Sequence, residues 1–174
     1  MTPPIIETER LVLRRMMAYD APALHTMLSD AETMRYWSTT PHTTLAESEA
    51  WVADGLAAMA RGDGIDFVVL ESNRVIGRVA FWMGNEIGFL FSRAVWGKGY
   101  AQEAMTAVLR HGFEQLGFKS VRADVDPGNT RSLKLLERVG FQRTGTAEKT
   151  FKIGDTWVDS VYLELKAEAF ADRR

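Results

Sequence analysis

Residues 100–116 carry the clearest helical pattern in the chain, and a glycine-rich turn leads into them. Apolar residues recur there every three to four positions, which places them on one face of a helix that must pack against other structure. Gly117 follows, and glycine readily ends a helix. Before the helix, Gly97 and Gly99 flank Lys98 directly after a strand-like apolar segment. The chain is therefore predicted to hold a strand, a tight turn and a helix in succession here.

Helix and strand patterns alternate along the rest of the chain. The strands of the middle section are separated by short turn signals, so they are predicted to form an antiparallel meander. This order of helices and strands indicates a mixed α+β (α/β) fold, in which helices flank a single central, mostly antiparallel sheet. A length of 174 residues predicts one domain over residues 1–174. Strands are predicted at 11–13, 66–71, 75–83, 86–91, 121–125, from 141 onward and at 157–165, and further helices at 20–28, 44–60 and 129–139.

The composition excludes several classes of site and partner. The chain has no cysteine, which excludes a disulfide framework, a cysteine nucleophile and cysteine-ligated metals. His25 and His111 lie in predicted helices, and no histidine or acidic spacing indicates a metal site, so no metal is expected. A formal net charge of −2 argues against a nucleic-acid partner. No apolar run reaches the ~20 residues that span a bilayer, and no secretory pattern opens the chain. We therefore expect a cytoplasmic protein without a membrane partner.

The glycine turn, as we call residues 96–101, has the features of an anion site. Glycine allows the backbone to approach a ligand closely, and the unpaired N–H groups of the following helix attract negative charge. Lys98 adds a cation. A Walker phosphate loop would need Ser or Thr after Gly-Lys, where Gly99 stands, and the Rossmann spacing of three glycines is not completed. A glycine turn that merely begins a helix is equally compatible with these residues.

A second junction of strand and helix follows about thirty residues later. Asn129 is a suitable N-cap for the helix it precedes, and Ser132 falls in the first turn of that helix. On its own this pattern is as typical of an ordinary capped helix as of a binding site. Because the two junctions could converge at one end of a sheet, the pair is more informative than either alone.

Motifs in a fixed order resemble the GNAT superfamily of acyl-CoA N-acyltransferases, most closely its RimJ/RimL-like branch. The resemblance extends from about residue 8 to residue 165. The motifs are Thr8-Glu9-Arg10-Leu11-Val12-Leu13-Arg14, Glu86-Ile87-Gly88-Phe89, Trp96-Gly97-Lys98-Gly99-Tyr100-Ala101-Gln102-Glu103-Ala104, Asn129-Thr130-Arg131-Ser132, Glu137-Arg138-Val139-Gly140-Phe141 and Gly154-Asp155-Thr156-Trp157-Val158-Asp159-Ser160-Val161-Tyr162.

The resemblance implies acetyl-CoA as co-substrate. The glycine turn would hold the pyrophosphate through backbone N–H groups, and pantetheine would fill a gap between strands 86–91 and 121–125 by main-chain hydrogen bonds. A backbone N–H near Phe91 would polarise the thioester carbonyl. Trp96 stands where the family usually has Gln or Arg. The implied cofactor-binding residues are Phe91, Ser92, Trp96, Gly97, Lys98, Gly99, Tyr100, Ala101, Gln102, Asn129 and Ser132.

The implied reaction is direct attack of a primary amine on the acetyl thioester, with no protein nucleophile. Glu86 is the candidate base, because a partly buried glutamate has a raised pKa; a carboxylate in solvent or in an ion pair is the alternative. Many family members carry a tyrosine as proton donor where Leu136 stands. Ser132 is the implied substitute, unless its hydroxyl is satisfied within its own helix. Tyr100 and Tyr162 are weaker alternatives.

The acceptor pocket is the least defined part of the sequence. The candidate substrate-binding residues are Trp37, His42, Trp82 and Glu86, although an aromatic residue is more often part of a core. The amine acceptor would be a protein N-terminus or a small molecule. A non-catalytic module that senses acyl-CoA is the alternative function, since Leu136 replaces the usual tyrosine. Relatives are often dimers, so a homodimer is a further expectation.

Overall fold

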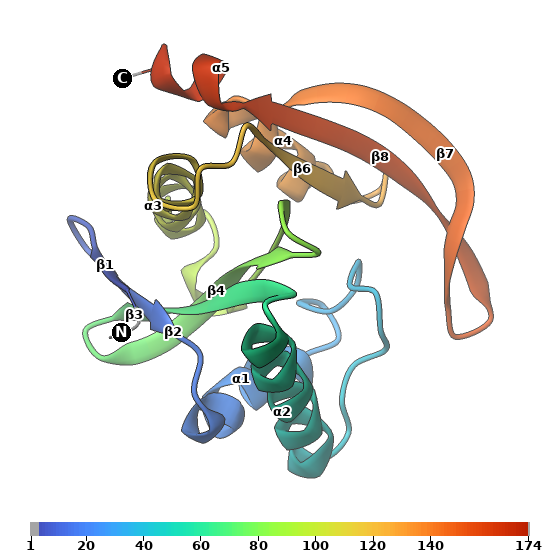
Figure 1. Cartoon of the computed structure of the whole chain (residues 1–174). Coiled ribbons are helices and arrows are strands. Elements are labelled where there is room, and N and C mark those ends of the chain that lie inside the picture. Colours follow the sequence, from blue (N-terminus) through green and yellow to red (C-terminus); the bar gives the residue numbers. More distant parts are fainter. Residues whose placement is uncertain (1–3, 174) are drawn as a thin grey trace.

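In the computed structural model, which describes residues 4–173, the strands form one eight-stranded sheet in the order β1-β2-β3-β4-β5-β6-β8-β7. Helices α1 and α2 lie on one face of the sheet, and α3 and α4 lie on the other (Figure 1). None of the helices in this part of the chain is both long and apolar enough to cross a membrane. The strands are β1 (Ile5–Glu7), β2 (Val12–Arg15), β3 (Gly64–Glu71), β4 (Arg74–Trp82), β5 (Glu86–Phe91), β6 (Ser120–Val125), β7 (Gln142–Ile153) and β8 (Thr156–Lys166); the α-helices are α1 (Ala21–Leu28), α2 (Leu45–Arg61), α3 (Tyr100–Glu114), α4 (Thr130–Val139) and α5 (Ala167–Ala171).

The predicted fold class and the antiparallel meander are confirmed. β3, β4 and β5 pair antiparallel in succession. The two residues between β3 and β4, Ser72 and Asn73, both have positive φ, as a tight hairpin turn that matches strand twist requires. Helix α2 begins with a capping box, in which Thr44 and Glu47 each bond the other's backbone N–H, as their spacing predicts. Local turn and cap chemistry therefore agrees with the tertiary structure in these segments.

Some elements differ from the prediction. β1 and α5 are too short to show a periodic pattern, and tertiary contacts stabilise them: β1 pairs with β2, and Phe170 of α5 packs into the core. Asp20 occupies the N-cap position of α1 without capping it, because its carboxylate accepts hydrogen bonds from Arg14 and from the Met17 amide. Residues 1–3 and 174, which the single-domain prediction includes, lie outside the described residues.

Two hydrophobic clusters lie on opposite faces of the sheet. The larger one packs the sheet against α3 and α4, and it includes Leu136, whose side chain is fully buried. The smaller one packs the other face against α1 and α2. Since Leu136 belongs to the core, the position that holds a tyrosine in many relatives of the resembled family contributes packing in this protein and no hydroxyl.

The central feature for function is the separation of β5 from β6. These parallel strands pair only at Glu86 and Arg122, near the start of each strand. The Arg122 amide donates to the Asn85 carbonyl over 3.0 Å, and the Asn85 side-chain amide donates to the Ser120 carbonyl over 3.0 Å. Beyond this pair the ladder stops, so the backbones of β5 and β6 are unpaired along the rest of β5, as the resemblance implies, and we call this unpaired region the gap.

His111, in the last turn of α3, is a partly buried histidine with a buried Nε2 atom, and it has a predictable effect on stability. Its ring lies edge-on to Phe67 at 5.7 Å between centroids, and within residues 4–173 its Nε2 has no hydrogen-bond partner. Burial lowers the pKa of His111 below its ordinary 6.5. The unfolded chain therefore binds the proton more readily, and stability falls as pH decreases from about 6.5 toward the lower native value. Between pH 7.5 and 5, the free energy of unfolding measured with urea is expected to fall less steeply with decreasing pH in His111→Leu than in the wild type. An identical dependence would contradict this assignment.

Candidate active site

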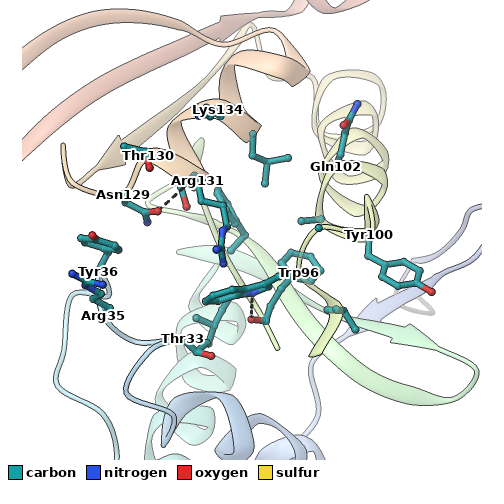
Figure 2. Close-up of a pocket in the computed structure, with 18 of the residues that line it drawn as sticks. Thr33, Arg35, Tyr36, Trp96, Tyr100, Gln102, Asn129, Thr130, Arg131 and Lys134 are labelled. Carbon is teal, nitrogen blue, oxygen red and sulfur yellow. Dashed lines mark hydrogen bonds between the residues drawn. The ribbon is translucent and has the colours of Figure 1, made fainter. Parts of the chain in front are cut away.

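A cleft of about 490 Å³ opens where the gap between β5 and β6 meets the ends of two helices. Its walls come from the end of β5, the glycine turn, the first turns of α3 and α4, and the loop that joins α1 to α2 (Figure 2). The two strand-to-helix junctions predicted from the sequence therefore do converge on one cavity. Far-apart segments of the chain supply its walls, which is typical of a ligand site.

The structure brings most of the implied cofactor-binding residues to this cleft, and their roles stay predictions. Two of the eleven are not among the lining residues. The Ser92 amide donates to the Ile76 carbonyl and so continues the pairing of β5 with β4. Lys98 is exposed, and its carbonyl faces Arg10 instead of the cleft. The nine that line it are Phe91, Trp96, Gly97, Gly99, Tyr100, Ala101, Gln102, Asn129 and Ser132.

The glycine turn presents backbone amides without side-chain caps. Gly97 and Gly99 have φ of +74° and +80°, a region that favours glycine, and Gly99 is the N-cap of α3 with no capping side chain. The first N–H groups of a helix have no partner within it, so those of α3 are available to an anion at the positive end of the helix dipole. Trp96 Nε1 donates to the Phe91 carbonyl over 2.9 Å and ties the turn to the end of β5.

The open edge of β5 offers further donors. The Ser92 amide bonds to β4, and N–H groups of successive residues in a strand point to opposite edges. The amides of Phe89 and Phe91 therefore point away from β4, into the gap toward β6. A ligand with alternating polar groups could pair with them as an added strand.

The first turn of α4 forms the opposite wall. Asn129 caps the helix as predicted, since its side-chain oxygen accepts from the Ser132 amide over 3.2 Å. Within the described residues, the Ser132 hydroxyl makes no hydrogen bond of its own, so it is not satisfied within the helix and remains available to a ligand. Arg131 lies over the Trp96 ring (Figure 2), and its guanidinium carbon is 3.9 Å from the ring centroid.

Basic residues on α4 also line the cleft and were missed in the sequence analysis. Arg131, Lys134 and Arg138 recur every three to four residues, so they share one helical face, and all three reach the cavity wall. Arg35 adds a cation from the facing loop. The helical spacing of the first three was a usable signal. These cations suit a ligand that carries several negative charges.

Glu86 lies at the closed end of the gap and is not among the residues that line the cleft. Its half-buried carboxylate has a pKa above its ordinary 4.5, first because burial penalises the charge and second because Asp124 repels it; Arg122 opposes the rise. Next along the same face of β5, a side chain at Gly88 would meet open space. Glu86 can therefore hold a proton at higher pH than a free glutamate, beside an accessible surface.

The other candidate substrate residues are dispersed. Trp37 lines the cleft, and its ring lies 5.7 Å from the guanidinium of the buried Arg78. Trp82 is about half exposed and pairs with Glu86 across β4 and β5. His42 does not line the cleft, because its Nδ1 bonds to the buried Ser48 hydroxyl over 2.8 Å. Of the four candidate substrate residues Trp37, His42, Trp82 and Glu86, Trp37 alone lines the cleft.

Comparisons with known proteins agree with this geometry. A family model described as an acetyltransferase (GNAT) domain matches residues 10–142. A Bacillus licheniformis protein named as an uncharacterized N-acetyltransferase, p20, is 32% identical over 172 residues, which covers 94% of this chain and 97% of the relative. The ribosomal protein uS5-alanine N-acetyltransferase of Escherichia coli (strain K12) is 33% identical over 79 residues, or 45% of this chain and 41% of that protein.

Solved structures show the same fold. The spermidine N-acetyltransferase of Vibrio cholerae, in complex with CoA and spermine, superposes with a TM-score of 0.82 at 21% identity, over 94% of this chain and 99% of that one. RimL, a ribosomal L7/L12 α-N-protein acetyltransferase in complex with coenzyme A, superposes with a TM-score of 0.85 at 18% identity, over 95% and 99% of the two chains.

Proposed function

The chain belongs to the acetyltransferase (GNAT) family, and on that premise we propose that it transfers an acetyl group from acetyl-CoA directly to a primary amine. The observation that carries the proposal is the convergence of two kinds of free backbone donor on one cleft. The glycine turn offers amides at a helix N-terminus, and β5 offers amides along an open edge. A ligand with a diphosphate and an amide-containing arm matches both: the diphosphate can accept from the glycine turn, and the arm can pair with β5.

The fit of acetyl-CoA to these residues supports the proposal. The glycine turn would hold the diphosphate, and the basic face of α4 would add positive charge beside it. The amides of Phe89 and Phe91 would pair with the pantetheine arm and orient the thioester at the Phe91 end. Acetyl-CoA supplies the activated acyl group. Two proteins of the same fold are described in complex with coenzyme A.

Glu86 and Ser132 are the proposed proton-handling residues. An amine reaches the enzyme as an ammonium, and Glu86, with its raised pKa, would accept its proton directly or through a water molecule. The amine lone pair then attacks the acetyl carbon, the C–S bond breaks, and the proton that the nitrogen loses passes to the departing thiolate, directly or through water. Ser132, whose hydroxyl is free within the described residues, would donate a hydrogen bond to the departing thiolate. Leu136 is part of the core and takes no part.

The acceptor is proposed as a protein N-terminus or a small amine, because similar proteins are named for both classes. We also propose a cytoplasmic location; a homodimer stays a prediction. The alternative, a module that binds acyl-CoA without transfer, is favoured only by the buried Leu136, which removes one candidate donor. Binding and transfer are separated by the following test.

Acetyl-CoA is expected to raise the melting temperature of the protein by roughly 5–10 °C at about 100 times its dissociation constant, because binding to the native state adds about 2.7 kcal/mol. ATP at the same concentration is the control, since a general phosphate site would respond to both. Release of free thiol with a panel of amines and N-terminal peptides then distinguishes an enzyme from a sensor. No melting shift with acetyl-CoA would contradict the proposed function.

A further inference from the structure

The N-terminal motif Thr8-Glu9-Arg10-Leu11 has no role in the function proposed above, yet it contacts the glycine turn. Thr8 and Arg10 lie in the turn between β1 and β2, and both bind Glu103 in the first turn of α3. Glu103 Oε1 accepts from the Thr8 hydroxyl over 2.6 Å and from the Arg10 amide over 2.9 Å. Oε2 accepts from Arg10 Nε over 2.7 Å. The Glu103 side chain is only 17% exposed, and its bond to Nε orients the Arg10 guanidinium.

The same guanidinium reaches the glycine turn. Arg10 Nη1 donates to the Lys98 carbonyl over 2.9 Å, and the guanidinium carbon lies 4.3 Å from the centre of the Tyr100 ring. A trans peptide is planar, and its C=O and N–H point in opposite directions. Since Arg10 holds the Lys98 carbonyl, the N–H of Gly99 in the same peptide points away from Arg10. Gly99 itself lines the cleft.

We propose that Arg10 is a positioning residue for the diphosphate of acetyl-CoA: it fixes the peptide between Lys98 and Gly99 so that the Gly99 amide faces the anion. The inference rests on the proposed function, because it takes the glycine turn as the diphosphate site. Arg10 acts through the backbone and does not touch the co-substrate.

Charge balance supports this role. Glu103 lies near the positive end of α3, where an isolated carboxylate would compete with a bound anion. Although burial raises the pKa of Glu103, hydrogen bonds from Thr8 and Arg10 outweigh it and hold that pKa below its ordinary value. Glu103 is therefore ionised, and Arg10 neutralises it. Arginine suits the task because its planar fork can bond to Glu103 and to the Lys98 carbonyl together, whereas a lysine presents a single ammonium.

The test compares Arg10→Met and Arg10→Lys with the wild type. Without the Arg10 guanidinium, the peptide between Lys98 and Gly99 can rotate. We therefore expect the dissociation constant for CoA, measured by calorimetry, to rise about tenfold in Arg10→Met and by less in Arg10→Lys. The KM for acetyl-CoA should rise in parallel while kcat changes little. With S-acetylpantetheine as donor, which has no diphosphate, kcat/KM should stay within about twofold of the wild type. A general loss of structure would instead lower kcat/KM with acetyl-CoA and with S-acetylpantetheine alike.

Arg143→Met is the matched control, because Arg143 Nε bonds to Glu137 over the same 2.7 Å in a more exposed ion pair outside the cleft. It should leave CoA affinity unchanged. Wild-type affinity in Arg10→Met, or an equal loss with S-acetylpantetheine, would overturn this inference alone. If the wild-type protein binds no CoA, the proposed function fails, and this inference fails with it. If Arg10→Met does not fold, the same comparison of acetyl-CoA with S-acetylpantetheine is made in Arg10→Lys, and its outcome decides the inference.

Discussion

Replacement of Gly99 by valine is expected to weaken CoA binding by more than about 100-fold. Gly99 has a φ of +80° and a ψ of 0°, a left-handed conformation that a β-branched residue strongly disfavours. A Cβ there would lie 3.4 Å from Arg10 Nη2, in ordinary van der Waals contact, so the effect comes mainly from backbone strain. The turn would relax into another conformation and lose several amide contacts to the anion, each worth about 1.5–3 kcal/mol when the partner is charged. Calorimetric titration with CoA measures the effect.

Gly84→Val separates backbone strain from the loss of the site. Gly84 has a similar φ of +89°, lies in the turn between β4 and β5, and has open space where a Cβ would stand. This variant should lose stability to a comparable degree and still bind CoA with wild-type affinity. If Gly99→Val bound CoA as tightly as Gly84→Val does, the diphosphate would have to lie elsewhere.

Replacement of Glu86 by glutamine is expected to lower kcat about 100-fold at neutral pH, with little change in CoA affinity. Glutamine has nearly the shape of glutamate but cannot accept the ammonium proton. Glu86 lies at the closed end of the gap, outside the lining of the cleft proposed to bind CoA, so CoA affinity should be spared. Steady-state transfer and CoA calorimetry on the same preparation measure the two effects.

The charged neighbours of Glu86 predict how the pH dependence of activity will shift when they are replaced. Activity in the wild type should fall as pH decreases through the raised pKa of Glu86, because only the carboxylate can act as base. Asp124 raises that pKa and Arg122 lowers it. Asp124→Asn should therefore move the acid limb of kcat/KM to lower pH, and Arg122→Met should move it to higher pH. Shifts in the same direction, or none, would remove Glu86 from the role of base.

Stability offers an independent readout of the same group. The native pKa of Glu86 is above its unfolded value, so the free energy of unfolding falls as pH rises from about 4.5, the unfolded value, toward the native pKa, and the full penalty applies above it. Glu86→Gln should then unfold at a higher urea concentration than the wild type at neutral pH while it transfers acetyl groups more slowly. A variant that loses both activity and stability would indicate damage to the fold instead.

The parts of the fold that follow from local chemistry could be predicted. Apolar spacing along α3, the capping box at Thr44 and the turn at Ser72 each specify a conformation within a few residues. The glycine turn was predicted for the same reason. The element order, joined with the family resemblance, was enough to predict one mixed sheet flanked by helices and a cleft at two strand-to-helix junctions.

The missed features depend on contacts between distant segments. Arg10 meets Glu103 and Lys98 about 90 residues away, and no local pattern marks that pairing. His42 stays a candidate for the acceptor site, and no local pattern marks its contact with the buried Ser48 of α2. β1 and α5 contain three and five residues, too few for a period to emerge. Sequence alone identifies which groups are reactive more easily than which of them meet.

The single point of pairing between β5 and β6 leaves the two halves of the sheet weakly joined. Strands β1 to β5 form one half-sheet and β6 to β8 the other, and the ladder joining them is one residue pair wide, secured at its end by Asn85. In the proposed binding mode, the pantetheine arm of acetyl-CoA lies in the remainder of that seam. The co-substrate then serves as a temporary strand, and every turnover closes the seam on binding and reopens it when CoA leaves.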